Sequence, residues 1–97
     1  MTRSHDKSVT DNRSRSRYEI EVNGELAGFS AYQQRGDLVI FTETIIDPRF
    51  RGRGIGSRLV AAALADVERR ELRVMPRCSF VQDFLRLQPP PRCAVEA

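Results

Sequence analysis

Residues 46–57 read IDPRFRGRGIGS, and this stretch decides the expected fold. Three glycines, Gly52, Gly54 and Gly56, occupy every second position, with arginines between and around them. A strand pattern precedes the stretch and a helical pattern follows it. The first N–H groups of a helix lack partners within the helix, and that end is positive, so an anion is favoured there. Because glycine lets the backbone approach a ligand closely and arginine adds charge, the stretch predicts a phosphate-binding loop.

A helix, a short strand and a second helix are predicted after the loop. Apolar residues recur at three- and four-residue steps from residue 56 to about residue 70, which is typical of an amphipathic helix. They are Ile55, Leu59, Val60, Ala63, Leu64 and Val67. Residues 72–75 form a short apolar run closed by Pro76, and a strand–helix–strand order implies a right-handed parallel crossover. Ser79 begins the last helix, in which Phe80 and Phe84 are expected in the core.

Three antiparallel strands are predicted before the loop. Residues 18–22 alternate apolar and charged side chains, and Asn23-Gly24 is a hairpin signal. Residues 26–33 and 38–46 follow as the second and third strands, separated by a turn. The expected fold class is therefore α/β, with a three-strand antiparallel meander, a parallel crossover strand and two helices.

The chain is expected to form one domain with two polar ends. Ninety-seven residues suit a single core. Residues 1–17 hold almost nothing apolar, so we expect a disordered leader there. Residues 18–88 form the expected domain, and residues 89–97 begin with three prolines and are expected to be a tail.

Composition narrows the possible functions. The formal net charge is +3, all of it from residues 1–17, and an evenly charged domain argues against a nucleic-acid-binding face. An arginine- and serine-rich leader that tethers RNA is a weaker alternative, because it has no aromatic residue for base stacking. The longest apolar run is far shorter than a membrane span, and no signal peptide is readable. Cys78 and Cys93 lack metal-ligand spacing, so we expect no metal and a cytoplasmic location.

Two common phosphate motifs do not fit the loop. A P-loop needs a lysine that the loop lacks, and the dinucleotide fingerprint needs glycine where Ser57 stands. The pattern R-x-x-G-x-G, formed by Arg51, Gly54 and Gly56, resembles the acetyl-CoA pyrophosphate loop of the GNAT superfamily of N-acetyltransferases. The alternative is a glycine-rich turn that merely starts a helix.

The resemblance extends from about residue 18 to residue 88 and is to the small, single-domain GNAT-like group. Phe41-Thr42-x-Thr44 precedes the loop, and Cys78-Ser79-Phe80-Val81 follows the next strand, as in that group. Where the group's pattern has histidine, this sequence has Glu43, so no role for that histidine carries over.

The resemblance implies acetyl-CoA as cosubstrate and an amine as acceptor, without a metal. It places the pantetheine arm against the backbone of Ile45 and Ile46, and the thioester near Cys78 and Glu43. The implied cofactor-binding residues of the loop are Arg51, Gly52, Arg53, Gly54, Ile55, Gly56 and Ser57.

Cys78 and Glu43 are the candidate catalytic residues. Glu43 could be a general base, directly or through water, or an ordinary exposed strand residue. Cys78 precedes a predicted helix start, where a thiolate is favoured. It could protonate the departing CoA thiolate, accept the acetyl group itself in a two-step route, or be a small buried hydrophobe.

We expect an N-acetyltransferase that moves an acetyl group from acetyl-CoA to an unidentified amine. The alternative function is an acyl-CoA-binding or regulatory module with little turnover. It is favoured by the lack of readable N-terminal helices, which shape the acceptor site in larger GNAT enzymes. The sequence names neither the acceptor nor the oligomeric state.

Overall fold

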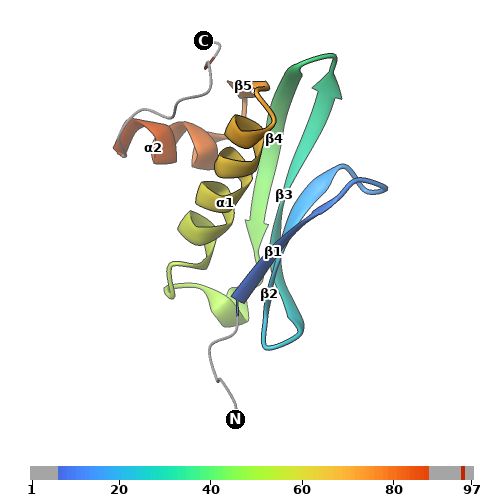
Figure 1. Cartoon of the computed structure of the whole chain (residues 1–97). Coiled ribbons are helices and arrows are strands. Elements are labelled where there is room, and N and C mark those ends of the chain that lie inside the picture. The colour runs from blue at the N-terminus through green and yellow to red at the C-terminus, as the bar shows by residue number, and fades with distance from the viewer. Residues whose placement is uncertain (1–6, 88–94, 96–97) are drawn as a thin grey trace.

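Five strands lie side by side in the order β1-β2-β3-β4-β5, with two helices packed on one face (Figure 1). This is a computed structural model, and it describes residues 7–87 and 95. The strands are β1 (Lys7–Asn12), β2 (Arg17–Val22), β3 (Glu25–Arg35), β4 (Leu38–Ile46) and β5 (Arg73–Pro76). The helices are η1 (Pro48–Phe50), α1 (Ile55–Arg69) and α2 (Ser79–Leu87). The predicted α/β architecture is confirmed, with one strand more than expected.

The additional strand is β1, which occupies part of the expected leader. It pairs antiparallel with β2 from Lys7 opposite Val22 to Asn12 opposite Arg17. The expectation of disorder through residue 17 is therefore corrected for residues 7–17, and the meander has four strands instead of three. Residues 1–6 lie outside the described residues. So does the expected tail, except Val95, which forms a parallel bridge with Val74.

Side chains far away in the sequence hold β1 in place. Asp11 accepts a hydrogen bond from Tyr32 Oη at 2.5 Å and another from Arg70 at 2.7 Å. Arg70 also lies 3.1 Å from Asp66, which accepts a hydrogen bond from Tyr18 Oη at 2.6 Å. This cluster ties β1 to β2, β3 and the end of α1, and these links supply the stabilisation that the polar composition of β1 lacks.

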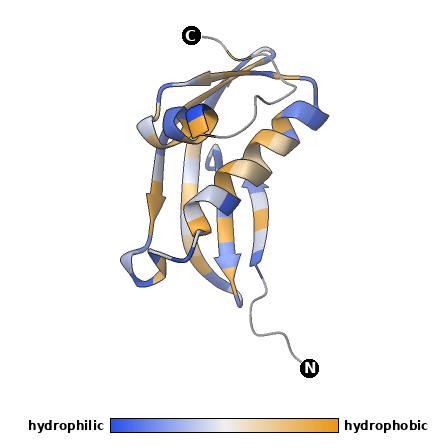
Figure 2. Cartoon of the chain, turned by 90° about the vertical axis from the view of Figure 1, so that its left-hand side faces the viewer, coloured by the Kyte–Doolittle hydropathy of each residue, from blue (hydrophilic) through white to orange (hydrophobic). Residues whose placement is uncertain are grey.

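One face of α1 packs against the sheet. The apolar positions predicted from the helical period are all buried. They share one core with inward-facing strand residues such as Ile20, Phe41 and Val74. Figure 2 shows hydrophobic and hydrophilic residues alternating along the strands that α1 crosses. Full burial of one such aliphatic or aromatic side chain stabilises the fold by about 1.5–3 kcal/mol. Within residues 7–87, no helix is long and apolar enough to cross a membrane.

β4 and β5 run side by side for only a few residues and then separate. β4 and β5 pair from Leu38 opposite Arg73 to Phe41 opposite Pro76. The Arg77 N–H then donates to Phe41 O at 2.9 Å. Because β5 ends there, residues 42–46 of β4 have no strand partner on that side in the described chain. An open strand edge therefore runs toward the glycine loop.

Candidate functional site

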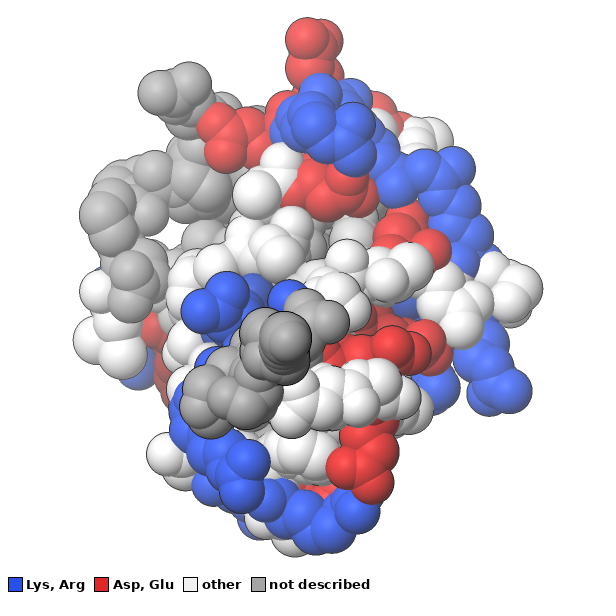
Figure 3. All heavy atoms as spheres, turned by 60° about the horizontal axis from the view of Figure 1, so that its bottom comes forward, with Lys and Arg blue, Asp and Glu red and all other residues white. Residues whose placement is uncertain are grey.

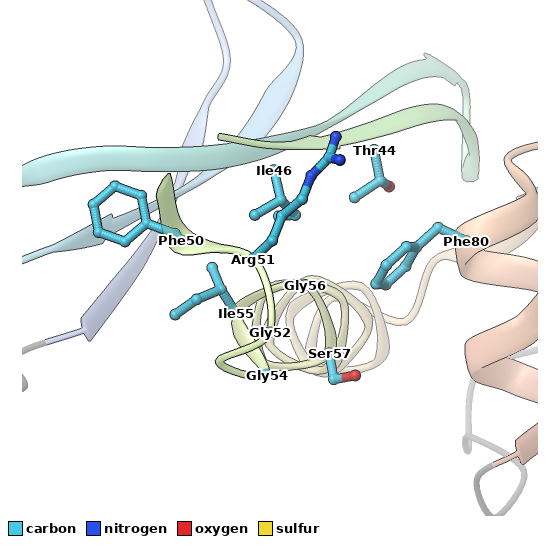
Figure 4. Close-up of a pocket in the computed structure, with 10 residues that line it drawn as sticks. All are labelled: Thr44, Ile46, Phe50, Arg51, Gly52, Gly54, Ile55, Gly56, Ser57 and Phe80. Carbon is cyan, nitrogen blue, oxygen red and sulfur yellow. The ribbon is translucent and has the colours of Figure 1, made fainter. Parts of the chain in front are cut away.

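The glycine loop joins β4 to α1 and bounds a cavity of about 400 Å³ (Figure 4). Gly52 and Gly54 adopt φ of +80° and +72°, which strain any residue with a Cβ. Gly54 caps α1 without a side-chain hydrogen bond, and its carbonyl accepts from the Arg58 N–H at 3.1 Å. The N–H groups of residues 55–57 therefore have no partner within the helix. An anion beside this turn would meet unpaired donors and the positive end of the helix.

Most of the loop residues singled out from the sequence line this cavity. They are Ile46, Arg51, Gly52, Gly54, Ile55, Gly56 and Ser57. Two do not. The side chain of Ile45 faces the opposite side of the sheet, beside Leu26 and Phe29. The guanidinium of Arg53 lies over the Phe50 ring, 5.6 Å from its centroid.

Three further residues line the cavity: Thr44, Phe50 and Phe80. Phe80 was expected in the core, and it packs partly buried against the core while also forming a wall of the cavity. Its ring lies so close to Gly56 that a Cβ there would overlap it. No local sequence signal indicates this contact, because it joins the first turns of two helices.

The arginines around the loop differ in what they bind. Arg49 is held by Asp47 at 3.1 Å and by Glu25 at 3.0 Å. Hydrogen bonds from the Arg49 side chain and backbone keep the pKa of Asp47 below its usual value. Arg51 has no ion-pair partner among the described residues, and Figure 4 shows its side chain extending past Ile46 into the cavity. Arg51 is thus the cation available to a ligand there.

Basic and acidic side chains are interspersed on the face that Figure 3 shows. The positive charge beside the loop is therefore local and does not extend as a continuous basic surface over that face. Within residues 7–87, no group of three or more His, Cys, Asp or Glu side chains is arranged to hold a metal ion.

A bulge in β4 decides which of its residues face the cavity. Tyr32 pairs with Phe41 and Ala31 pairs with Glu43, so Thr42 is an extra residue in β4. Before the bulge, Phe41 faces the core; after it, Thr44 lines the cavity and Glu43 is exposed. The structure thus places Thr44, and not Glu43, on the wall of the cavity, and a role of Glu43 beside the thioester stays a prediction.

Cys78 lies behind the Thr44 wall, at the start of α2. It is 6% exposed, and its carbonyl accepts from the Gln82 N–H at 3.0 Å. The Cys78 thiol donates to Thr44 Oγ1, with 3.4 Å between sulfur and oxygen. Thr44 Oγ1 lies 2.9 Å from Ser30 Oγ, and Ser30 is fully buried. The sequence motif contained Thr44 without a role, and Ser30 had no signal at all. Cys93, which like Cys78 lacks metal-ligand spacing, lies outside the described residues.

A match to a model of a known protein family indicates the family of this chain. The family model described as GCN5-related N-acetyl-transferase matches residues 17–92. No curated protein gave a significant match to the chain.

Solved structures with similar folds include two acetyltransferases and a protein named Ard1. The ribosomal-protein-S18-alanine N-acetyltransferase from Escherichia coli has a TM-score of 0.55 and 23% identity, over 58% of this chain and 36% of that chain. Ard1 from Thermoplasma volcanium has a TM-score of 0.52 and 26% identity, over 59% and 39%. An aminoglycoside acetyltransferase from an uncultured soil metagenomic sample has a TM-score of 0.55 and 15% identity, over 76% and 56%. The chain thus spans less than two fifths of the length of the first two. Because the family match covers most of its residues, the chain belongs to the GCN5-related N-acetyltransferase family.

Proposed function

We propose that this protein binds acetyl-CoA at the loop between β4 and α1 and transfers the acetyl group to an amine. The observation that carries this proposal is the unpaired first turn of α1, which forms one wall of the cavity together with Arg51. Backbone N–H groups, a helix N-terminus and a free guanidinium are the groups that bind a pyrophosphate. The glycines leave no side chain between the ligand and these donors.

The remainder of the coenzyme fits the open edge of β4. The pantetheine arm contains two amides, and residues 42–46 have no strand partner on the β5 side in the described chain. A peptide-like arm can add to such an edge through main-chain hydrogen bonds. Ile45 would take part only through its backbone, because its side chain faces the other side of the sheet. The cavity of about 400 Å³ holds part of the coenzyme, and the nucleotide would extend outside it.

In this proposed arrangement the thioester would lie near Thr44 and Cys78. As an acid, Cys78 would give its proton to the CoA thiolate as the carbon–sulfur bond breaks. As a nucleophile, its thiolate would attack the acetyl carbonyl and release CoA; the amine would then take the acetyl group and regenerate the thiol. Both routes consume one acetyl-CoA and one amine and yield CoA and an amide. Glu43, being exposed, would act as a base only for an amine outside the cavity or through water.

The acceptor class is inferred from the comparisons. The names of two of the similar structures mention acceptors: an alanine of a ribosomal protein in one and aminoglycosides in the other. Each of these acceptors carries an amine. We therefore propose a primary amine as acceptor. A module that binds acyl-CoA with little turnover is the second candidate, since neither Cys78 nor Glu43 is among the residues that line the cavity.

Two measurements test the proposal. Calorimetric titration with CoA tests binding, and free thiol release from acetyl-CoA over a panel of amines tests transfer, with Cys78→Ala and Glu43→Gln as comparisons. Binding with amine-dependent thiol release supports the transferase. Binding without release to any amine supports the binding module, and absence of binding overturns both functions.

A further inference from the structure

Three side chains form a hydrogen-bonded row at the cavity wall. Ser30 on β3 lies beside Thr44 on β4, with 2.9 Å between their oxygens. Thr44 in turn accepts from the Cys78 thiol, with 3.4 Å between sulfur and oxygen. Ser30 is fully buried and Cys78 is 6% exposed. Thr44 is the member of the row that lines the cavity.

The bulge at Thr42 creates this row. It shifts the inward-facing positions of β4, so that Thr44 and Ile46 take the inner face that Val39 and Phe41 hold earlier in the strand. Ser30 pairs directly with Thr44 across the two strands. Adjacent strand residues on one face have side chains close enough to interact. A hydroxyl pair is therefore held beside the thiol by the sheet itself.

A hydroxyl row can serve both forms of the sulfur. A hydroxyl group donates one hydrogen bond and accepts others, and its hydrogen rotates to suit its partner. When Cys78 is a thiol, it donates to Thr44, which donates to Ser30. When Cys78 is a thiolate, Thr44 can turn its hydrogen to the sulfur while Ser30 donates to Thr44 Oγ1. No atom has to move except the two hydroxyl hydrogens.

We propose that Thr44, supported by Ser30, is a positioning residue that orients the Cys78 thiol and donates a hydrogen bond to its thiolate. This inference rests on the proposed function, because it concerns the sulfur beside the proposed acetyl-CoA site. It adds two residues, on β3 and β4, to the machinery of that site.

Charged side chains around Cys78 offer no comparable contact. Cys78 has no ion-pair partner among the described residues, and it lies immediately before α2, which begins at Ser79. β5 carries Arg73, which is paired with Asp37 at 3.0 Å. Of the other charged groups on the surrounding elements, Asp66 and Glu68 on α1 are half-buried. The rest are exposed: Glu25 and Arg35 at the ends of β3, Glu43 on β4, Arg58 and Arg69 on α1, Arg77 after β5, and Asp83 and Arg86 on α2.

The test measures alkylation of Cys78 by iodoacetamide as a function of pH in the full chain. The thiolate attacks the methylene carbon and iodide leaves, so the rate follows the thiolate fraction. Peptide mass spectrometry follows Cys78 and Cys93 separately, and Cys93 is the internal control. The plateau rate at high pH reports access to the sulfur, whereas the pH midpoint reports the stability of the thiolate.

Thr44→Val keeps the shape of the side chain but removes the hydroxyl. We expect its Cys78 midpoint to rise by about one pH unit or more, because a hydrogen bond to a charged group is lost. Thr44→Ser restores the hydroxyl and should keep the midpoint near that of the wild type. Ser30→Ala should raise it by about half a unit, since Thr44 can still donate but loses its support.

An unchanged midpoint in folded Thr44→Val overturns the proposal, and so does an equal shift at Cys93. If Thr44→Val does not fold, Ser30→Ala decides: an upward shift supports the proposal and no shift overturns it. The assay contains no coenzyme, so its result does not depend on the proposed function. CoA titration of the wild type tests that function separately.

Discussion

The Phe80 ring of α2 rests on Gly56 in the first turn of α1, with no room for a Cβ between them. Gly56 is buried and lies inside the helix. Its glycine is therefore required by the packing of two helices, in addition to any approach of a ligand. The contact also fixes α2, and with it Cys78, relative to the loop.

Gly56→Ala should destabilise the fold by about 1–3 kcal/mol, because the added methyl group forces the Phe80 ring to move. The sign of this stability change tests the contact, because glycine-to-alanine at an open helical site stabilises by up to about 1 kcal/mol. Urea unfolding measures the effect. Phe80→Leu in the Gly56→Ala background should recover part of the loss, and a double-mutant cycle without coupling would contradict the contact.

Gly54→Ala should weaken CoA binding and cost about 1–2 kcal/mol of stability, because the residue holds φ of +72°. Gly36→Ala is the matched control. It has φ of +61° and open space around the missing Cβ, as Gly54 has, but it lies in the β3–β4 turn away from the cavity. Both variants should lose similar stability by urea unfolding, and only Gly54→Ala should lose CoA affinity by calorimetry. Equal loss of affinity in both would show that Gly54 has no local role.

The free energy of unfolding should fall at alkaline pH because of the buried Tyr32 phenol. Burial, with a hydrogen bond to Asp11, raises the pKa of Tyr32 from 10.0 to about 12. Between these values the unfolded chain releases the phenol proton while the folded chain keeps it. The stabilisation is therefore complete below pH 10 and is lost as the pH rises to about 12. Urea unfolding from pH 8 to 12 should show this decline, and Tyr32→Phe should make it shallower. An identical pH dependence in the variant would refute the assignment.

Local sequence patterns predicted the elements whose stability is local or periodic. The helical period of α1 and the glycine spacing of the loop predicted the residues that form one wall of the cavity. Both patterns involve residues that are close together in the sequence. β1 was missed because its support comes from Tyr32 and Arg70, 21 and 59 residues away from Asp11. The sequence did not predict that Thr44, and not Glu43, faces the cavity. The bulge that turns Thr44 inward depends on pairing with β3, which strand alternation does not encode.

Arg49 and Arg51 lie two residues apart but differ in their partners. Arg51 extends into the cavity without an ion-pair partner among the described residues, whereas Arg49 is paired with both Asp47 and Glu25. Arg51→Ala should weaken CoA binding about tenfold, because a charge-assisted hydrogen bond to phosphate is lost. Arg49→Ala should change the affinity less than about twofold, since its charge is already compensated.

Calorimetry at two salt concentrations measures both effects, and the salt dependence of binding should fall in Arg51→Ala alone. Arg35 at the far end of β3 is exposed and has no ion-pair partner within residues 7–87, so it supplies the control for nonspecific charge loss. Arg35→Ala should bind CoA as the wild type does. Equal weakening by all three substitutions would mean that the coenzyme responds to overall charge and not to a guanidinium in the cavity. Weakening by Arg49→Ala alone would move the phosphate site from the cavity to the η1 turn.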